Sequence, residues 1–166
     1  GLEALVTSAI DLGDADAAEA WLARLERLAE HPIAAPTVAR ARSRVSLVTG
    51  DADTALIAAE RAILLAQADG RGVERAEAEI LRARAQIARR QAGAATRDLA
   101  SLVTASEAHG YRAVRRSAAR ELRRVGRRLP PVAASGWPGL SLREREVALL
   151  LAKGLSNAAL AGELFL

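Results

Sequence analysis

Glycine-containing signals between apolar-periodic segments constrain the fold of this 166-residue chain more than any other feature. Two of them read Gly13-Asp14-Ala15-Asp16-Ala17-Ala18 and Gly50-Asp51-Ala52-Asp53-Thr54-Ala55, and a related third stretch reads Gly93-Ala94-Ala95-Thr96-Arg97. Glycine readily adopts the left-handed conformation that ends a helix, and aspartate caps the start of the next one. The glycines recur at spacings of 37 and 43 residues, which is typical of stacked helical hairpins.

The segments around these signals carry apolar residues at the helical period. Around Gly50 the periodic residues are Val38, Ala41, Val45 and Val48, then Leu56, Ala59, Ile63 and Ala66. His31-Pro32 and residues 69–72 separate successive hairpins. The other expected helices span residues 2–12, 15–30, 73–91, 95–109 and 111–129. We therefore predict an all-α fold of three stacked helical hairpins and a closing helix.

Residues 1–129 resemble a tetratricopeptide-like helical repeat domain. The pattern Gly-Asp-x-x-x-Ala, with Ala62 seven residues after Ala55, is similar to the second-helix half of that repeat. Because aromatic residues make up only 2% of the chain, we expect a core of alanine, leucine and valine at short helix–helix distances. Stacked repeats leave a concave surface that binds partners, so a protein or a small-molecule effector is the expected ligand of this domain.

Positive charge is concentrated in one segment. Residues 1–111 have a net charge of −3, residues 112–128 a net charge of +7, and the remaining residues a net charge of 0. We expect nonspecific phosphate contacts, which raise affinity for DNA without reading its sequence, from Arg112, Arg116, Arg120, Arg123, Arg124 and Arg127. The alternatives are a solvated outer face, or pairing of these arginines with acids of the preceding helices.

The end of the chain has the pattern of a second module. Residues 130–139 are rich in proline and glycine and are expected to form a linker. Ser141 and Glu144 form a capping-box pattern, so a helix should begin at Leu142 and end near Gly154. Its apolar residues on one face are Val147, Leu150 and Leu151. Ser156 can cap a second short helix, so residues 140–166 have the pattern of two helices joined by a tight turn.

This terminal module resembles the LuxR-type helix-turn-helix. The matching residues are Leu140, Ser141, Arg143, Glu144, Glu146, Val147, Leu150, Ala152, Gly154, Ser156, Asn157, Ala161 and Leu164. In that family the recognition helix and a fourth helix that commonly mediates dimerisation would follow. We therefore expect a C-terminal fragment of a longer bacterial regulator, truncated within the helix-turn-helix. Ala159 and Gly162 depart from the family pattern and weaken the second helix.

The resemblance implies roles for particular residues. Lys153, Ser156 and Asn157 lie where the second helix of such a module meets the DNA backbone, so we expect phosphate contacts from them and no base readout. DNA is the expected partner of the intact protein, and a homodimer is compatible with the family. The fragment alone is expected to associate with DNA weakly and in a salt-sensitive way, through residues 112–128.

Several other classes of function lack support in the sequence. Cysteine is absent, which excludes disulfides, thiolate nucleophiles and cysteine zinc sites. The aspartate pairs after Gly13 and Gly50 are explained by helix capping, and neither His31 nor His109 belongs to a catalytic set. No phosphate-binding loop and no long apolar run is present. We expect no enzyme, no cofactor, no metal site and no membrane segment, and a cytoplasmic location.

Two readings of function stay open besides the regulator. The chain could be a protein-interaction scaffold in which the helical repeats act without DNA binding and the last helices only cap the stack. A small-molecule receptor would differ by having a closed apolar pocket within the repeats.

Overall fold

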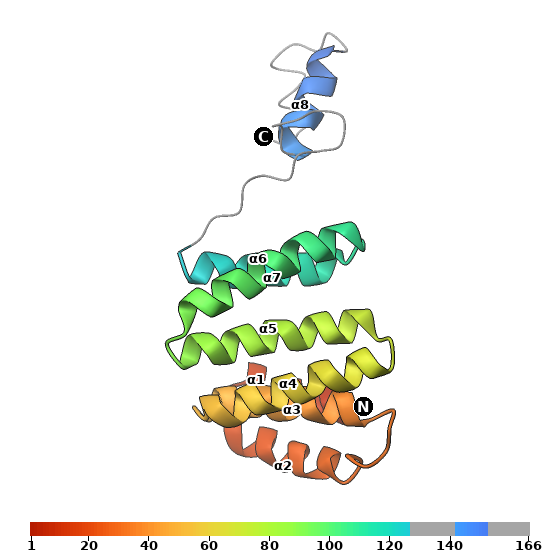
Figure 1. The fold of residues 1–166 in the computed structure, drawn as a ribbon, viewed down its shortest axis with the longest axis vertical. Helices are drawn as coiled ribbons and strands as arrows, with labels where there is room; N and C mark the ends of the chain where they lie inside the picture. Colours follow the sequence, from red (N-terminus) through yellow and green to blue (C-terminus); the bar gives the residue numbers. More distant parts are fainter. Residues whose placement is uncertain (127–141, 153–166) are drawn as a thin grey trace. The chain divides into compact units, whose positions relative to one another are not determined.

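The fold is all-helical, as predicted from the sequence (Figure 1). The structure, a computed structural model, describes residues 1–126 and 142–152, and side chains only of residues 1–126 and 147–152. Within these ranges the chain forms eight α-helices and no strand. The chain divides into two compact units, residues 1–128 and residues 129–166.

Seven helices belong to the first unit and one to the second. The first unit contains α1 (Leu2–Asp11), α2 (Ala15–Glu26), α3 (Ala35–Val48), α4 (Ala52–Ala68), α5 (Gly72–Ala88), α6 (Ala92–Ala108) and α7 (Arg112–Arg124). The second unit contains α8 (Leu142–Ala152).

The first unit is a stack of helical hairpins (Figure 1). Each helix from α1 to α7 packs against the next one in the chain. The odd-numbered helices also contact one another in series, α1 with α3, α3 with α5, and α5 with α7, whereas no two of α2, α4 and α6 are in contact. The odd-numbered helices therefore form a continuous row through the stack, whereas the even-numbered helices are separated from one another.

Five of the turns between α1 and α7 share one design. A helix ends, the second residue after it has a positive φ of 62° to 83°, and the third residue is the N-cap of the next helix. The N-cap N–H donates to the carbonyl five residues earlier, as Asp51 does to Ser46 at 2.8 Å. The positive-φ residues are Gly13, Gly50, Gly70, Arg90 and Gly110. From Gly50 onward they recur every 20 residues, so α4, α5 and α6 each have 17 residues.

The predicted aspartate caps are confirmed. Asp14 Oδ1 accepts a hydrogen bond from the Ala17 N–H at 2.9 Å, and Asp51 Oδ1 accepts one from the Thr54 N–H at 3.0 Å. The Thr54 side chain and backbone lower the pKa of Asp51 below its usual range, because they stabilise the ionised carboxylate. The stabilisation from this carboxylate is therefore present at neutral pH and is lost as the pH falls through the lowered pKa.

The prediction for the third signal is wrong. Gly93 lies in the first turn of α6, and the left-handed residue of this turn is Arg90, with a φ of 62°. As a result α5 ends at Ala88 and α6 begins at Ala92, both three residues earlier than expected. Packing of α5 and α6 sets the turn, although the residue at its left-handed position has a Cβ.

Two predicted helix ends are also wrong. Helix α2 ends at Glu26, not at residue 30, because the chain continues through turns in which Leu28 and Ala29 donate to carbonyls three residues earlier. Helix α7 ends at Arg124, not at residue 129, because Gly126 adopts a φ of 78°.

Replacing Arg90 by glycine is expected to raise the free energy of unfolding by about 1 kcal/mol, because it removes the Cβ from a left-handed residue. Arg90 is exposed and makes no ion pair among the described residues, so the change removes little else. Urea unfolding measures the effect. Gly50→Ala, at a φ of 83°, is the matched opposite and should destabilise. An Arg90→Gly variant less stable than the parent would contradict this account of the turn.

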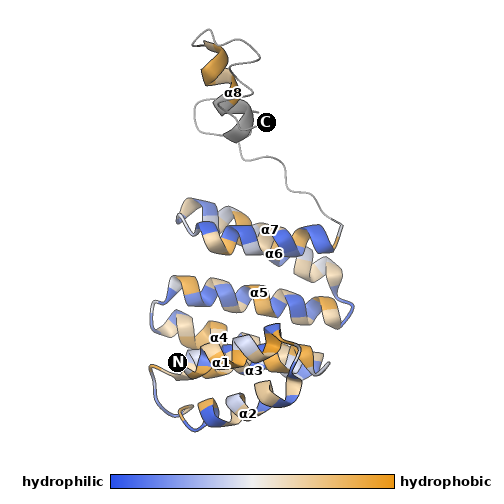
Figure 2. Ribbon diagram, turned by 180° about the vertical axis from the view of Figure 1, so that it is seen from behind, coloured by the Kyte–Doolittle hydropathy of each residue, from blue (hydrophilic) through white to orange (hydrophobic). Residues whose placement is uncertain are grey.

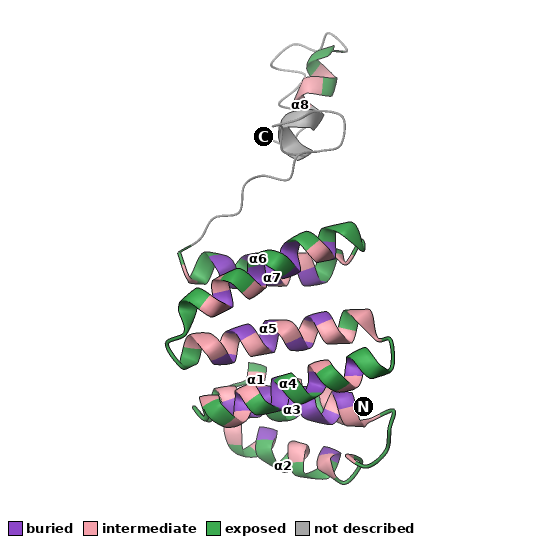
Figure 3. Ribbon diagram, in the orientation of Figure 1, coloured by how far each residue is buried: buried purple, intermediate pink, exposed green. Residues whose placement is uncertain are grey.

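The core of the stack consists largely of alanine. The buried residues of α4 are all alanines, namely Ala55, Ala58, Ala59, Ala62 and Ala66. Buried residues line the faces between neighbouring helices of the stack (Figure 3), and both polar and apolar residues occur on each of α1 to α7 (Figure 2). Small buried side chains let helix backbones approach closely, so the expected alanine-rich packing is confirmed.

Ion pairs connect the odd-numbered helices. Arg40 of α3 is only 5% exposed and contacts Glu3 of α1 at 3.1 Å and Glu77 of α5 at 3.3 Å. Glu121 of α7 is 2% exposed and accepts hydrogen bonds from Nη2 and Nε of Arg84 of α5 at 2.7 and 3.0 Å. These pairs fix the register of the continuous row and orient α7.

Candidate nucleic-acid interface

Helix α7 closes the stack and presents the basic segment. It begins after Gly110, with a φ of 72°, and ends before Gly126. Val114, Ala118 and Leu122 are buried where α7 packs on α5 and α6. These three residues therefore cap the stack, as expected of a closing helix, and Val125 after the helix is half-buried.

The single acid of α7 does not neutralise its outer face. The Glu121 side chain lies inside, where Arg84 donates to it from α5. Arg124 also donates to both Glu121 oxygens at 3.2 Å, so this arginine is partly neutralised despite its exposure. The outer side of α7 therefore keeps the charge of its other arginines.

Four of the predicted arginines form a row on one side of α7. They are Arg112, Arg116, Arg120 and Arg123, here called the arginine row. Their spacings of four, four and three residues place them within an arc of about 80° and over about 17 Å of helix axis. All four are exposed, and none makes an ion pair with another described residue. The row matches the length of about five base-pair steps of a DNA duplex.

The alternative of pairing with acids holds for two arginines of this helix. Arg124 contacts Glu121, and Arg115, which was not predicted as a phosphate contact, lies 3.6 Å from Glu107 of α6. Arg127 lies outside the described residues. The arginine row is therefore the described part of the basic segment that is exposed and not paired with a described acid.

The terminal module is described only in part. Helix α8 begins at Leu142, as predicted, and ends at Ala152, close to the predicted stop. Val147 and Leu150 are half-buried, whereas Leu151 is 51% exposed, so the expected apolar face is only partly covered. The predicted phosphate contacts Lys153, Ser156 and Asn157 lie outside the described residues.

Two functional features escaped prediction from the sequence. The first is the buried ion pair of Arg84 and Glu121. Its two residues are 37 positions apart in the sequence, as are Arg40 and Glu3, and this repeated arginine–glutamate separation could have indicated the pair. The second is a cavity between α4, α5 and α6, which has no signature in the sequence because its residues come from separate turns.

Among the described residues, no group of three His, Asp or Glu side chains is placed to hold a metal ion. In the same part of the chain, no helix has the length and apolar character needed to cross a membrane. Comparison with known protein families, curated proteins and solved structures finds no match to the chain.

Proposed function

We propose that the chain is part of a bacterial, cytoplasmic LuxR-type transcriptional regulator that binds DNA. Residues 1–129 are its tetratricopeptide-like repeat domain, which binds an effector or a protein partner, and residues 140–166 belong to its helix-turn-helix. The observation that carries this proposal is the arginine row, four exposed arginines that find no acid among the described residues. It precedes the segment that resembles the LuxR-type module by fewer than 20 residues.

Duplex DNA carries regularly spaced negative phosphates surrounded by condensed counterions. A row of guanidinium groups along one helix side releases counterions from the duplex and so binds it without sequence preference. Guanidinium groups also suit phosphate better than ammonium groups, because their donors match its oxygens in pairs. In this proposal Lys153, Ser156 and Asn157 add phosphate contacts from the terminal module.

The test is the association of the full chain with two fluorescent duplexes of unrelated sequence. Replacing Arg112, Arg116, Arg120 and Arg123 together by glutamine should weaken both associations at least tenfold at about 50 mM salt. The matched control removes the same charge elsewhere, at four exposed arginines that make no ion pair with described residues: Arg27, Arg61, Arg90 and Arg97. If the two variants lose DNA affinity equally, the effect of the arginine row is explained by net charge alone.

Lys153→Ala gives a separate prediction for the terminal module. If this lysine contacts phosphate, the variant should weaken binding of the intact regulator to all DNA sequences by a similar factor. Titration with an operator and an unrelated duplex measures this. A loss confined to one sequence would contradict the assignment, because phosphate contacts carry no direct sequence information.

A protein-interaction scaffold is the second candidate function, favoured by exposed apolar residues on α4. Ile57 and Leu64 are each 68% exposed and lie seven residues apart, on the same side of the helix. Ile57 also lines a groove of about 510 Å³ between α3 and α4. In this candidate the repeats bind an apolar protein segment and no DNA, and Ile57→Ser should abolish the binding of that segment.

A further inference from the structure

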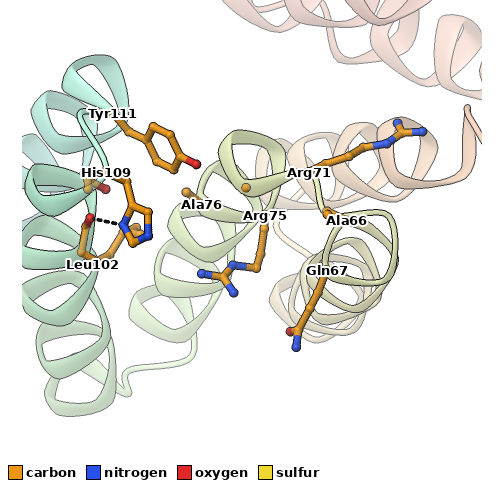
Figure 4. A pocket seen from close by; sticks show the side chains of 12 residues that line it. Ala66, Gln67, Arg71, Arg75, Ala76, Leu102, His109 and Tyr111 are labelled. Atoms are coloured by element: carbon orange, nitrogen blue, oxygen red, sulfur yellow. Dashed lines mark hydrogen bonds between the residues drawn. The ribbon is translucent and has the colours of Figure 1, made fainter.

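A cavity of about 180 Å³ lies where three helices and two turns of the stack meet (Figure 4). It is lined by the end of α4, the start of α5, the last turns of α6 and the residue before α7. An apolar cavity of about 150 Å³ is large enough for a benzene ring. The volume is therefore suited to a small organic molecule of one ring and one substituent.

The cavity contains a buried hydroxyl group that the fold leaves without a partner. Ser106 of α6 lines the cavity and is 1% exposed, and its Oγ makes no hydrogen bond within the described part of the chain. Buried hydroxyl groups are nearly always satisfied in folded proteins. The Nε of Arg75, which also lines the cavity, is likewise buried without a hydrogen-bond partner, although it lies 3.4 Å from Glu79. Two residues that line the cavity, on different helices, thus each carry a buried polar atom without a hydrogen-bond partner among the described residues.

The walls of the cavity are held in place by close packing. A Cβ at Gly72 would lie 2.5 Å from the Tyr111 hydroxyl, so only glycine allows the tyrosine ring to lie against the start of α5. The His109 ring stacks on Tyr111 with centroids 5.6 Å apart. His109 Nδ1 donates to the Ala105 carbonyl at 2.8 Å, and the opposite ring edge lies on the side of Arg75 (Figure 4).

The charged side chains that line the cavity are both cationic. Arg71 and Arg75 both line the cavity, and no acid does so among the described residues. Arg71 contacts Asp69 and Glu74, and Arg75 contacts only Glu79 among the described residues, so Arg75 is the less neutralised of the two. In addition, α5 begins at this cavity without a side-chain cap, with Glu74 as the acid of its first turn, and a helix start favours negative charge. Ala66, Ala76 and Leu102 provide the apolar part of the wall.

We propose that this cavity binds a small carboxylate with an aromatic or apolar body of about the size of benzoate. The carboxylate accepts hydrogen bonds from Arg75 and Ser106, and the body lies against Leu102 and the rings of His109 and Tyr111. Because the site joins α4, α5 and α6 at their ends, an occupied cavity holds two hairpins together next to α7. This inference rests on the effector-binding part of the proposed function and names the effector's chemical class.

Titration of the full chain with benzoate, followed by calorimetry and by amide chemical shifts, tests the proposal. Saturable binding is expected, with shifts at Ser106 and His109. Arg75→Met should weaken benzoate binding at least tenfold, and Gly72→Ala should also weaken it, because a Cβ at this position displaces the Tyr111 hydroxyl and so shifts one wall of the cavity. The matched control is Arg97→Met, an exposed arginine of α6 outside the cavity, which should bind benzoate as the parent does.

Two further probes separate the contribution of the aromatic ring from that of the negative charge. Benzyl alcohol has the ring without the charge, and inorganic phosphate has the charge without the ring, and both should bind at least tenfold more weakly than benzoate. The proposal would be overturned if benzyl alcohol or phosphate bound as tightly as benzoate. It would also be overturned if Arg75→Met left the benzoate affinity unchanged, or if benzoate binding did not saturate. DNA association measured on the same chain is a separate readout, so failure of the cavity and failure of the DNA-binding proposal are distinguishable.

Discussion

Replacing Glu121 by alanine is expected to lower the free energy of unfolding of the helical stack by about 2 to 3 kcal/mol. The side chain is 3% exposed and accepts two hydrogen bonds from Arg84, so its loss leaves a guanidinium group without its partner at the α5–α7 contact. Breaking a fully buried ion pair costs about 3 to 5 kcal/mol. The loss is smaller here because the Arg84 side chain is 40% exposed and regains water.

The matched control is Glu107→Ala on α6. The Glu107 side chain is 49% exposed and lies 3.6 Å from Arg115, so its loss should change stability by less than about 1 kcal/mol. Urea unfolding followed by circular dichroism measures both variants. If Glu121→Ala is no more destabilising than Glu107→Ala, the buried pair does not hold α7 on the stack.

Ala62→Leu is expected to lower the free energy of unfolding by about 3 kcal/mol, because the centre of the stack has no room for a larger side chain. Ala62 of α4 is completely buried and packs with Ala39 of α3 and Ala78 of α5, both of which are almost fully buried. Three extra carbon atoms at this position must separate helices that small side chains bring together. Thermal unfolding monitored by circular dichroism measures the loss.

Ala100→Leu on α6 makes the same chemical change at an exposed site. It should alter stability by less than about 0.5 kcal/mol, because surface substitutions rarely matter more. An Ala62→Leu variant as stable as the parent would show that the helices around Ala62 are not closely packed.

Local signals in the sequence are sufficient for most of the stack. Glycine followed by aspartate locates the starts of α2 and α4, because both the left-handed turn and the cap depend on residues that are adjacent in the chain. The signal failed where the same turn uses Arg90, since glycine is favoured there but not required when α5 and α6 pack around it. The residue that looked equivalent, Gly93, is simply part of a helix.

Long-range features of the candidate sites were harder to anticipate. The excess of arginine in residues 112–128 was visible, but which arginines remain exposed and unneutralised depends on how α7 rotates onto α5 and α6. Burial of Val114, Ala118 and Leu122 fixes that rotation and turns Glu121 inward. The cavity at Ser106 depends on Gly72 and Tyr111 meeting across the stack, and no local pattern indicates such a contact.

The salt dependence of DNA association tests the central claim most directly. The logarithm of the association constant should fall linearly with the logarithm of salt concentration, with a slope of about −0.9 for each phosphate neutralised. The parent chain should therefore have a slope steeper by about 3 to 4 than the variant lacking the arginine row. The variant lacking Arg27, Arg61, Arg90 and Arg97 should keep the parent slope. Identical slopes for the parent and the arginine-row variant would contradict the account.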